Sequence, residues 1–296
     1  MSNTATPTRS PPATTPRARL LPLPLDYPAD WASAYGEDRF GLWQAFDVAD
    51  VQQVMRWIPP GGFLMGSPKS EPERRDNERQ HPVRLTQGHW LADTACTQAL
   101  WAAVMDGANP SDFKNHSDNP VERVSWANVV SDFLPRLNAQ LPGLQACLPT
   151  EAQWEYACRA DAAINTPFGF GGQITSQQVN FDGHYPMPGS KKSEYRERTV
   201  PVTALPCNAW GLYQMHGNVW EWCADWYAPY PVDPAQPEAE LVDPAGPAQA
   251  PEAAWRVLRG GCWIFGARYC RSAMRYVIVP GLRNHFIGFR LARAAS

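Results

Sequence analysis

The segment from residue 255 to residue 293 constrains this chain most, because its residues fall into two interleaved sets. One set fixes or anchors the backbone: Gly260 and Gly261, then Pro280 and Gly281, and repeated arginines. Four of these arginines are expected to pin loops through bidentate bonds to carbonyls or carboxylates: Arg271, Arg275, Arg283 and Arg290. The other set is varied and mainly apolar, and its members recur at neither helical nor strand spacing. A core element should show one of those periods. The segment is therefore typical of a scaffold that carries interchangeable side chains, as a binding surface does.

The rest of the chain predicts an α+β fold with little regular secondary structure and long loops. The 13 Trp, 30 Pro and 21 Gly indicate that aromatic side chains, rather than long repetitive elements, supply much of the buried area. Helical patterns occur at residues 97–105, from Ser125 onward, and at 148–160, where Thr150 and Gln153 match a capping box. We expect about two helices and many short strands.

Composition also suggests where the chain divides. Residues 1–25 are rich in Pro and Thr and are predicted to be a disordered arm. Residues 26–57 carry several aromatics and are predicted to be an ordered lead-in. Residues 58–296 are predicted to form one domain that ends in the variable region 255–293. Within it, the charged stretch 69–80 is interpreted as a solvated loop.

Several classes of function are disfavoured. The net charge is only −3, which gives no overall field for nucleic acid or anionic membranes. No run of 18 apolar residues predicts a membrane span, and the first 25 residues lack the apolar core of a secretory signal. We therefore expect a cytoplasmic protein, with surface display as an open alternative. The seven cysteines form no CxxC pair and are predicted to be free thiols.

Eight motifs occur in a characteristic order: FLMGSP, TQALWAAVM, NPSDF, PVERVSW, LPTEAQWEYACRA, NAWGLYQMHGNVWEWCADWY, RVLRGG and GFRLAR. Over roughly residues 55–294 the chain resembles the formylglycine-generating enzyme (sulfatase-modifying factor) family. The resemblance implies a C-type-lectin-like fold elaborated with long loops.

The enzymes of that family hold copper with two cysteines five residues apart, in a G-G-S-[YW]-x-C-x-x-x-Y-C-x-R pattern. Here Phe265 stands at the first cysteine position, Cys270 at the second, and Cys262 at the serine position. Soft thiolates select copper(I), and a phenyl ring donates nothing. If the stretch is a strand, Cys262 faces away from position 265 and cannot replace the missing ligand. The resemblance therefore predicts a protein that is not an enzyme and requires no cofactor.

The same segment also resembles the variable proteins of diversity-generating retroelements, some of which share this fold. In those proteins a reverse transcriptase mutates adenines of a template repeat, mostly in AAC codons. Twelve of the varied residues can be reached from AAC, Cys262 can be reached from an AGC serine codon, and Met274 departs because it requires AAG. The predicted variable ligand-binding residues are Cys262, Ile264, Phe265, Gly266, Tyr269, Met274, Tyr276, Val277, Ile278, Val279, Leu282, Asn284, His285 and Phe286.

These residues predict an apolar, aromatic surface that binds a protein or another surface ligand, on a monomer. Two alternatives stay open: a formylglycine-generating copper oxidase, and an inactive member of that family in which the same residues form core. The burial of these residues discriminates between core and surface.

The motif HGNVWEWCADW suggests one metal site. Asn218 and Glu221 match calcium-ligand positions of the family, with carbonyls of Gln214, Gly217 and Val219 as partners, and Asn180 resembles a ligand of a second site. The alternative is that these side chains brace loops through hydrogen bonds. A histidine-based metal site is not expected, because the six histidines show no H-x-x-x-H spacing.

Overall fold

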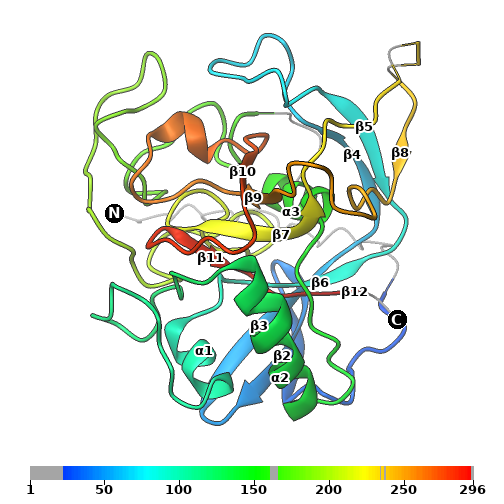
Figure 1. Cartoon of the computed structure of the whole chain (residues 1–296), viewed down its shortest axis with the longest axis vertical. Coiled ribbons are helices and arrows are strands. Elements are labelled where there is room, and N and C mark those ends of the chain that lie inside the picture. Colours follow the sequence, from blue (N-terminus) through cyan, green and yellow to red (C-terminus); the bar gives the residue numbers. More distant parts are fainter. Residues whose placement is uncertain (1–22, 161–165, 234, 237, 295–296) are drawn as a thin grey trace, which may run out of the picture.

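The computed structural model describes residues 23–160, 166–233, 235–236 and 238–294. Most of the predicted disordered arm therefore lies outside the described residues. Short strands and long connections dominate the rest, which confirms the α+β class with little regular structure (Figure 1).

Three sheets organise the chain. The first is five-stranded and has the order β1 (Ala34–Asp38), β2 (Gly41–Val48), β3 (Val51–Ile58), β6 (His89–Ala92) and β12 (Ala292–Ala294). The second is four-stranded and has the order β10 (Tyr276–Ile278), β9 (Arg256–Arg259), β7 (Trp220–Trp226) and β11 (Ile287–Phe289). The third is three-stranded and has the order β4 (Gly61–Met65), β5 (His81–Leu85) and β8 (Leu241–Val242).

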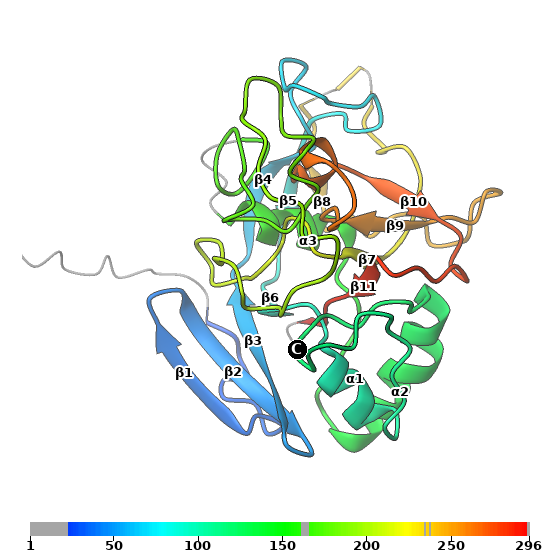
Figure 2. The same cartoon turned by 90° about the vertical axis from the view of Figure 1, so that its left-hand side faces the viewer.

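The predicted lead-in is part of the first sheet. β1, β2 and β3 form an antiparallel meander, and β3 pairs with β6, with Trp57 opposite Trp90. Figure 2 shows these strands on one side of the molecule, with α1 and α2 beside them. The boundary predicted at residue 57 falls at the last residues of β3, so residues 34–58 belong to the same folded body as the strands that follow.

The helices begin where the sequence places their caps. α1 (Gln98–Val104) starts at Thr97, whose hydroxyl accepts the N–H of Leu100 at 3.0 Å. The Ser125 hydroxyl accepts the N–H of Asn128 at 3.0 Å, ahead of a π-helical stretch, η1 (Asn128–Phe133), and α2 (Leu134–Gln140). α3 (Glu151–Arg159) carries the predicted capping box.

The core is aromatic, as the composition predicts. Its main cluster contains four fully or almost fully buried tryptophans: Trp90, Trp101, Trp220 and Trp222. A second cluster packs β4, β5 and α3 around Trp154. Between residues 166 and 219 the described chain has no helix or strand, as expected of a loop region. Among the described residues, no helix is both long and apolar enough to cross a bilayer.

Candidate functional site

The variable region folds back over the second sheet. It leaves β9, turns at Gly260 (φ 100°) and Gly261 (φ 79°), and forms a short 3-10 helix, η2 (Ala267–Cys270). β10 then pairs antiparallel with β9, and β11 pairs parallel with β7. A Cβ at Gly261 would lie 2.6 Å from the Cys270 sulfur, and positive φ is strained for other residues. Only glycine fits this turn.

Buried arginines hold this path in place. Arg271 donates to Glu71 at 2.6 Å and to both carboxylate oxygens of Glu78 at 2.7 Å. Arg275 forms a bidentate pair with Glu151 at 2.7 and 2.8 Å. Such forked pairs fix direction as well as position. Arg283, which we also expected to pin a loop, is instead exposed and makes no ion pair with the described residues.

The interpretation of residues 69–80 as a solvated loop is wrong in part. Glu71 is 6% exposed and Glu78 is fully buried, and both carboxylates form ion pairs with the guanidinium group of Arg271. The charged stretch therefore supplies the counter-ions of Arg271 in the variable region, although about 190 residues of sequence lie between them.

Two of the fourteen predicted binding residues are buried. Cys262 is 0% and Met274 1% exposed, and both belong to the main core cluster. Neither can touch a partner, so their prediction as contact residues is corrected. The strand expected at 262–265 is a turn, in which the Phe265 N–H donates to the Cys262 carbonyl at 3.3 Å.

The other twelve predicted residues all reach the surface at least in part. Val279 is 47% exposed. The other eleven are half-buried: Ile264, Phe265, Gly266, Tyr269, Tyr276, Val277, Ile278, Leu282, Asn284, His285 and Phe286. Several of them pack their inner faces against the main core cluster.

The aromatic members gather around Phe265. Its ring centroid lies 4.9 Å from Tyr269, 5.6 Å from Phe286 and 6.4 Å from Tyr276. The Tyr276 ring stacks on the fully buried Trp220 at 5.1 Å. We call Phe265, Tyr269, Tyr276, His285 and Phe286 the aromatic patch; His285 joins it through Phe286 at 5.4 Å.

A cavity of about 590 Å³ adjoins the patch. On one side the cavity is lined by Ile264, Phe265 and Tyr269 of the C-terminal variable region, called the tail below. The loop at 182–188 lines the other side. Its rim carries opposite charges: Arg268 lies 3.7 Å from Glu73. An aromatic centre with a polar rim is the usual anatomy of a protein-binding surface.

The loop at 182–188 is a component that sequence reasoning missed. Its backbone is tied to the tail, since the Asp182 N–H donates to the Phe265 carbonyl at 3.0 Å and the Ala267 N–H donates to the Tyr185 carbonyl at 2.9 Å. A Cβ on Gly266 would meet the Tyr185 carbonyl oxygen at 2.8 Å. Position 266 is therefore constrained, because a larger side chain there must displace this loop. The sequence carries no periodic signal that would have paired these segments.

The thiols do not fit a two-thiolate copper site. Cys270 and Cys262 are both fully buried, and burial raises the pKa of Cys270 to about 12 and that of Cys262 well above its usual value. Copper(I) requires deprotonated sulfur. The position that the resemblance assigns to the first cysteine ligand carries Phe265.

The predicted calcium ligands are occupied by protein groups. Both carboxylate oxygens of Glu221 accept from Arg290 at 2.8 Å, and Oε2 also accepts the Trp154 indole N–H at 2.6 Å. Asn218 Oδ1 accepts from Asn180 and from the Val200 N–H, both at 3.0 Å.

Glu221 therefore braces β7 against β11, and the two asparagines brace the loop at 198–200. No group of three or more His, Cys, Asp or Glu side chains in the described part of the chain could hold a metal, and the carbonyls of Gln214, Gly217 and Val219 stay predicted partners of a calcium ion. The alternative that these side chains brace loops fits these contacts better.

Known proteins resemble both the sequence and the fold. The bovine formylglycine-generating enzyme is 31% identical over 212 residues, which cover 67% of this chain and 52% of the enzyme. That of Streptomyces coelicolor is 34% identical over 193 residues, covering 63% of this chain and 56% of the enzyme. This chain thus spans about half the length of these relatives.

Among solved structures, Treponema denticola variable protein 1 superposes with a TM-score of 0.68 and 27% identity, covering 85% of this chain and 98% of that one. PvdO from Pseudomonas aeruginosa gives a TM-score of 0.66 at 25% identity, covering 84% and 97%. These matches confirm the predicted formylglycine-type, C-type-lectin-like fold and the resemblance to a variable protein. The model of the sulfatase-modifying factor enzyme 1-like domain matches residues 43–295, so this chain belongs to that family.

Proposed function

We propose that this chain is a non-catalytic, monomeric ligand-binding protein whose C-terminal segment is diversified by a retroelement through adenine-directed mutagenesis. One observation carries the proposal. The twelve residues reachable from AAC codons are half-buried or exposed, whereas residues 267 and 270–275, which lie between them, are buried. Such a division lets a side chain change without disturbing the backbone that carries it.

The anchors support this division because they do not depend on the variable side chains. Arg271, Arg275 and Arg290 pair with Glu78, Glu151 and Glu221, all of which lie outside the variable region. Fully paired, hydrogen-bonded charges in a buried position specify one geometry. The path of the tail is thus set by the constant part of the molecule.

The chemistry of the patch favours a protein ligand. Aromatic side chains provide large contact area at low conformational cost, and they dominate binding hot spots. The rim around the cavity adds charges of both signs, Glu73 and Arg268 among them. The similarity to Treponema denticola variable protein 1 supports the same role.

Two libraries test the proposal on the protein itself. The first randomises eleven variable codons, all but that of Gly266, as any base, any base, then C, which are the codons reached from AAC. The matched control randomises eleven buried positions in the same way: 257–259, 267, 270–275 and 287. Protease resistance of displayed variants reports folding. We expect most members of the first library and few of the second to resist cleavage. Equal failure of both would refute the division into surface and scaffold.

The flanking DNA tests diversification separately. A near-copy of the coding segment for residues 255–293, with AAC at the twelve codons and a reverse transcriptase gene beside it, is the expected arrangement. If no such copy lies near the gene, the surface can still bind a ligand, but the retroelement is excluded as its source.

The alternative is a formylglycine-generating copper oxidase, which the 31% identity to the bovine enzyme favours. We expect the protein, after incubation with copper(I), neither to retain copper nor to oxidise the cysteine of a sulfatase-derived peptide. Phe265→Cys is the informative comparison, because it restores the cysteine that the resemblance places at this position. Turnover by the unaltered chain would establish the alternative.

A further inference from the structure

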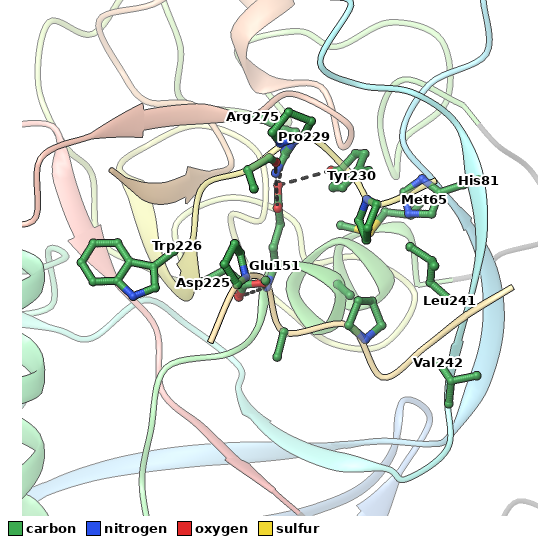
Figure 3. Close-up of a pocket in the computed structure, with 17 residues that line it drawn as sticks. Met65, His81, Glu151, Asp225, Trp226, Pro229, Tyr230, Leu241, Val242 and Arg275 are labelled. Carbon is green, nitrogen blue, oxygen red and sulfur yellow. Dashed lines mark hydrogen bonds and ion pairs between the residues drawn. The ribbon is translucent and has the colours of Figure 1, made fainter. Parts of the chain in front are cut away.

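A second cavity, of about 380 Å³, lies away from the aromatic patch (Figure 3). Pro229, Pro231, Leu241 and Val242 form much of its apolar wall, on the long excursion between β7 and β9 and on β8 within it. None of the twelve variable residues lines it, and Arg275 is its single contribution from the variable region. A change of variable side chains therefore leaves its lining unaltered.

One side of this cavity is already neutral. The carboxylate of Glu151 accepts two hydrogen bonds from the guanidinium group of Arg275. It also accepts one from the Tyr230 hydroxyl, at 3.3 Å. The Arg275 guanidinium lies 3.9 Å from the centroid of the Tyr230 ring. Figure 3 shows these three side chains joined by dashed lines. Their charges cancel within the protein, so they leave little for a charged ligand to neutralise.

Asp225 differs because no cation in the described part of the chain lies within ion-pair distance of it. Its side chain is 5% exposed, and Oδ2 accepts the backbone N–H of Glu151 at 2.7 Å. Arg275 and Arg256 attract its charge only from farther away. Burial, followed by repulsion from Glu151, raises the pKa of Asp225 to about 7. A buried carboxyl group without a counter-ion is costly when ionised, and a bound cation would relieve that cost.

His81 supplies an acceptor that no described protein group satisfies. The ring is 2% exposed, and Nδ1 lies 2.9 Å from the Arg79 carbonyl, which assigns the ring proton to Nδ1. Nε2 is buried and has no hydrogen-bond partner among the described residues. In Figure 3 His81 lies on the side of Met65 and Leu241, and Asp225 on the side of Trp226. The unpartnered groups of the cavity thus accept hydrogen bonds, and its walls are apolar.

We propose that this cavity binds a small organic amine with an apolar body, whose ammonium group pairs with Asp225. The apolar body contacts the proline and leucine wall, and a further N–H or O–H donor on the ligand satisfies His81. A ligand carboxylate is excluded by Asp225. The volume is at the small end of the range of about 300–1,000 Å³ found for ligand pockets, which limits the ligand to a single ring or a short chain.

Calorimetric titration of the full chain with three matched probes tests the proposal: 2-phenylethylamine, 2-phenylethanol and 3-phenylpropanoate. Probes of this size bind with a Kd of roughly 1 mM when they fit well, so the titrations extend about tenfold beyond that value. We expect saturable binding of the amine, at least tenfold weaker binding of the alcohol, and none of the acid. Equal binding of amine and alcohol, or no saturable binding of the amine, overturns the assignment.

Asp225→Asn is the decisive variant, because it keeps an oxygen that can accept the Glu151 N–H and removes the charge. We expect this substitution to weaken binding of the amine at least tenfold and to leave binding of the alcohol unchanged. The matched control is Asp50→Asn, at an exposed position between β2 and β3, which should bind as the original does. If Asp225→Asn binds the amine normally, the pairing is wrong.

Leu241→Trp covers the case in which Asp225→Asn disturbs the fold, because it fills the cavity from a half-buried wall position. It should abolish binding of all three probes, and persistent amine binding would place the site elsewhere. Phe265→Asn in the aromatic patch should change nothing. The proposal is independent of the function proposed for the patch, and either can fail alone.

Discussion

Replacing Phe265 and Phe289 separately by alanine discriminates most directly between a surface and a core in the C-terminal segment. Phe289 is fully buried in β11, with its ring centroid 5.2 Å from Phe133 and 6.1 Å from Trp101. Its removal leaves a closed cavity, and buried Phe→Ala changes typically cost about 3–5 kcal/mol. Phe265 is the matched partner, because it has the same side chain, lies in the same segment and is half-buried.

The expected cost at Phe265 is much smaller. Full burial of a phenylalanine is worth roughly 1.5–3 kcal/mol, and Phe265 is only partly buried, so its burial is worth about 1–2.5 kcal/mol. Because the side chain opens to the surface, we expect little of the cavity cost that a closed site adds. We therefore expect the free energy of unfolding to fall by about 1–2.5 kcal/mol for Phe265→Ala and by at least about 3 kcal/mol for Phe289→Ala.

Urea unfolding followed by tryptophan fluorescence measures both values, and equal slopes for all three proteins confirm that the same surface is exposed. If the two variants are destabilised equally, Phe265 is a core residue. The alternative of a divergent family member with an ordinary core would then hold, and the aromatic patch would not be a binding surface.

Three further outcomes are expected. Arg271→Ala leaves Glu71 and Glu78 buried without a counter-ion, so the free energy of unfolding should fall by about 3–5 kcal/mol, whereas Arg283→Ala, at an exposed position, should change it little in the same urea titration. Burial raises the pKa of Glu122 to about 7, so its ionisation destabilises the fold progressively from about pH 4.5 to pH 7. Glu122→Gln should therefore gain stability relative to the original chain across that range, and a difference in stability that does not change with pH would contradict the raised pKa of Glu122. Gly266→Asn should displace the loop at 182–188 and speed its cleavage in limited proteolysis. Asn284→Gly is the control and should leave cleavage of that loop unchanged. Equal cleavage rates in the two variants would show that the contact between position 266 and Tyr185 does not hold the loop in place.

Local patterns were sufficient wherever a contact closes within a few residues. Thr150 caps its helix as the sequence predicts, because the hydroxyl reaches an N–H three positions later. Thr97 and Ser125 make the same contact where the other two helical patterns begin. The glycine turn at 260–261 and the anchoring of Arg271 and Arg275 were predicted for similar reasons: the conformational freedom of glycine and the fork of a guanidinium belong to the residue itself.

The tertiary structure decided which side chains, far apart in the sequence, come into contact. Glu221 was a candidate calcium ligand until Arg290, 69 positions away, was seen to occupy both its oxygens. Cys262 and Met274 were predicted to belong to the variable set, but both are buried. Cys262 lies at the base of a tight turn, and Met274 faces the core. The codon pattern set these two residues apart from the twelve, but it did not indicate that they are buried, because burial depends on what the opposite segment supplies.

The sequence alone determined the family motifs and the two interleaved sets of residues in the C-terminal segment, because both are properties of residue type and order. Only the tertiary structure decided that twelve of the fourteen varied residues reach the surface, that the stretch at 69–80 anchors the tail, and that an acidic, proline-walled cavity lies apart from it. The physical reason is that exposure and ion pairing depend on contacts between segments distant in sequence, and these exist only once the chain has folded.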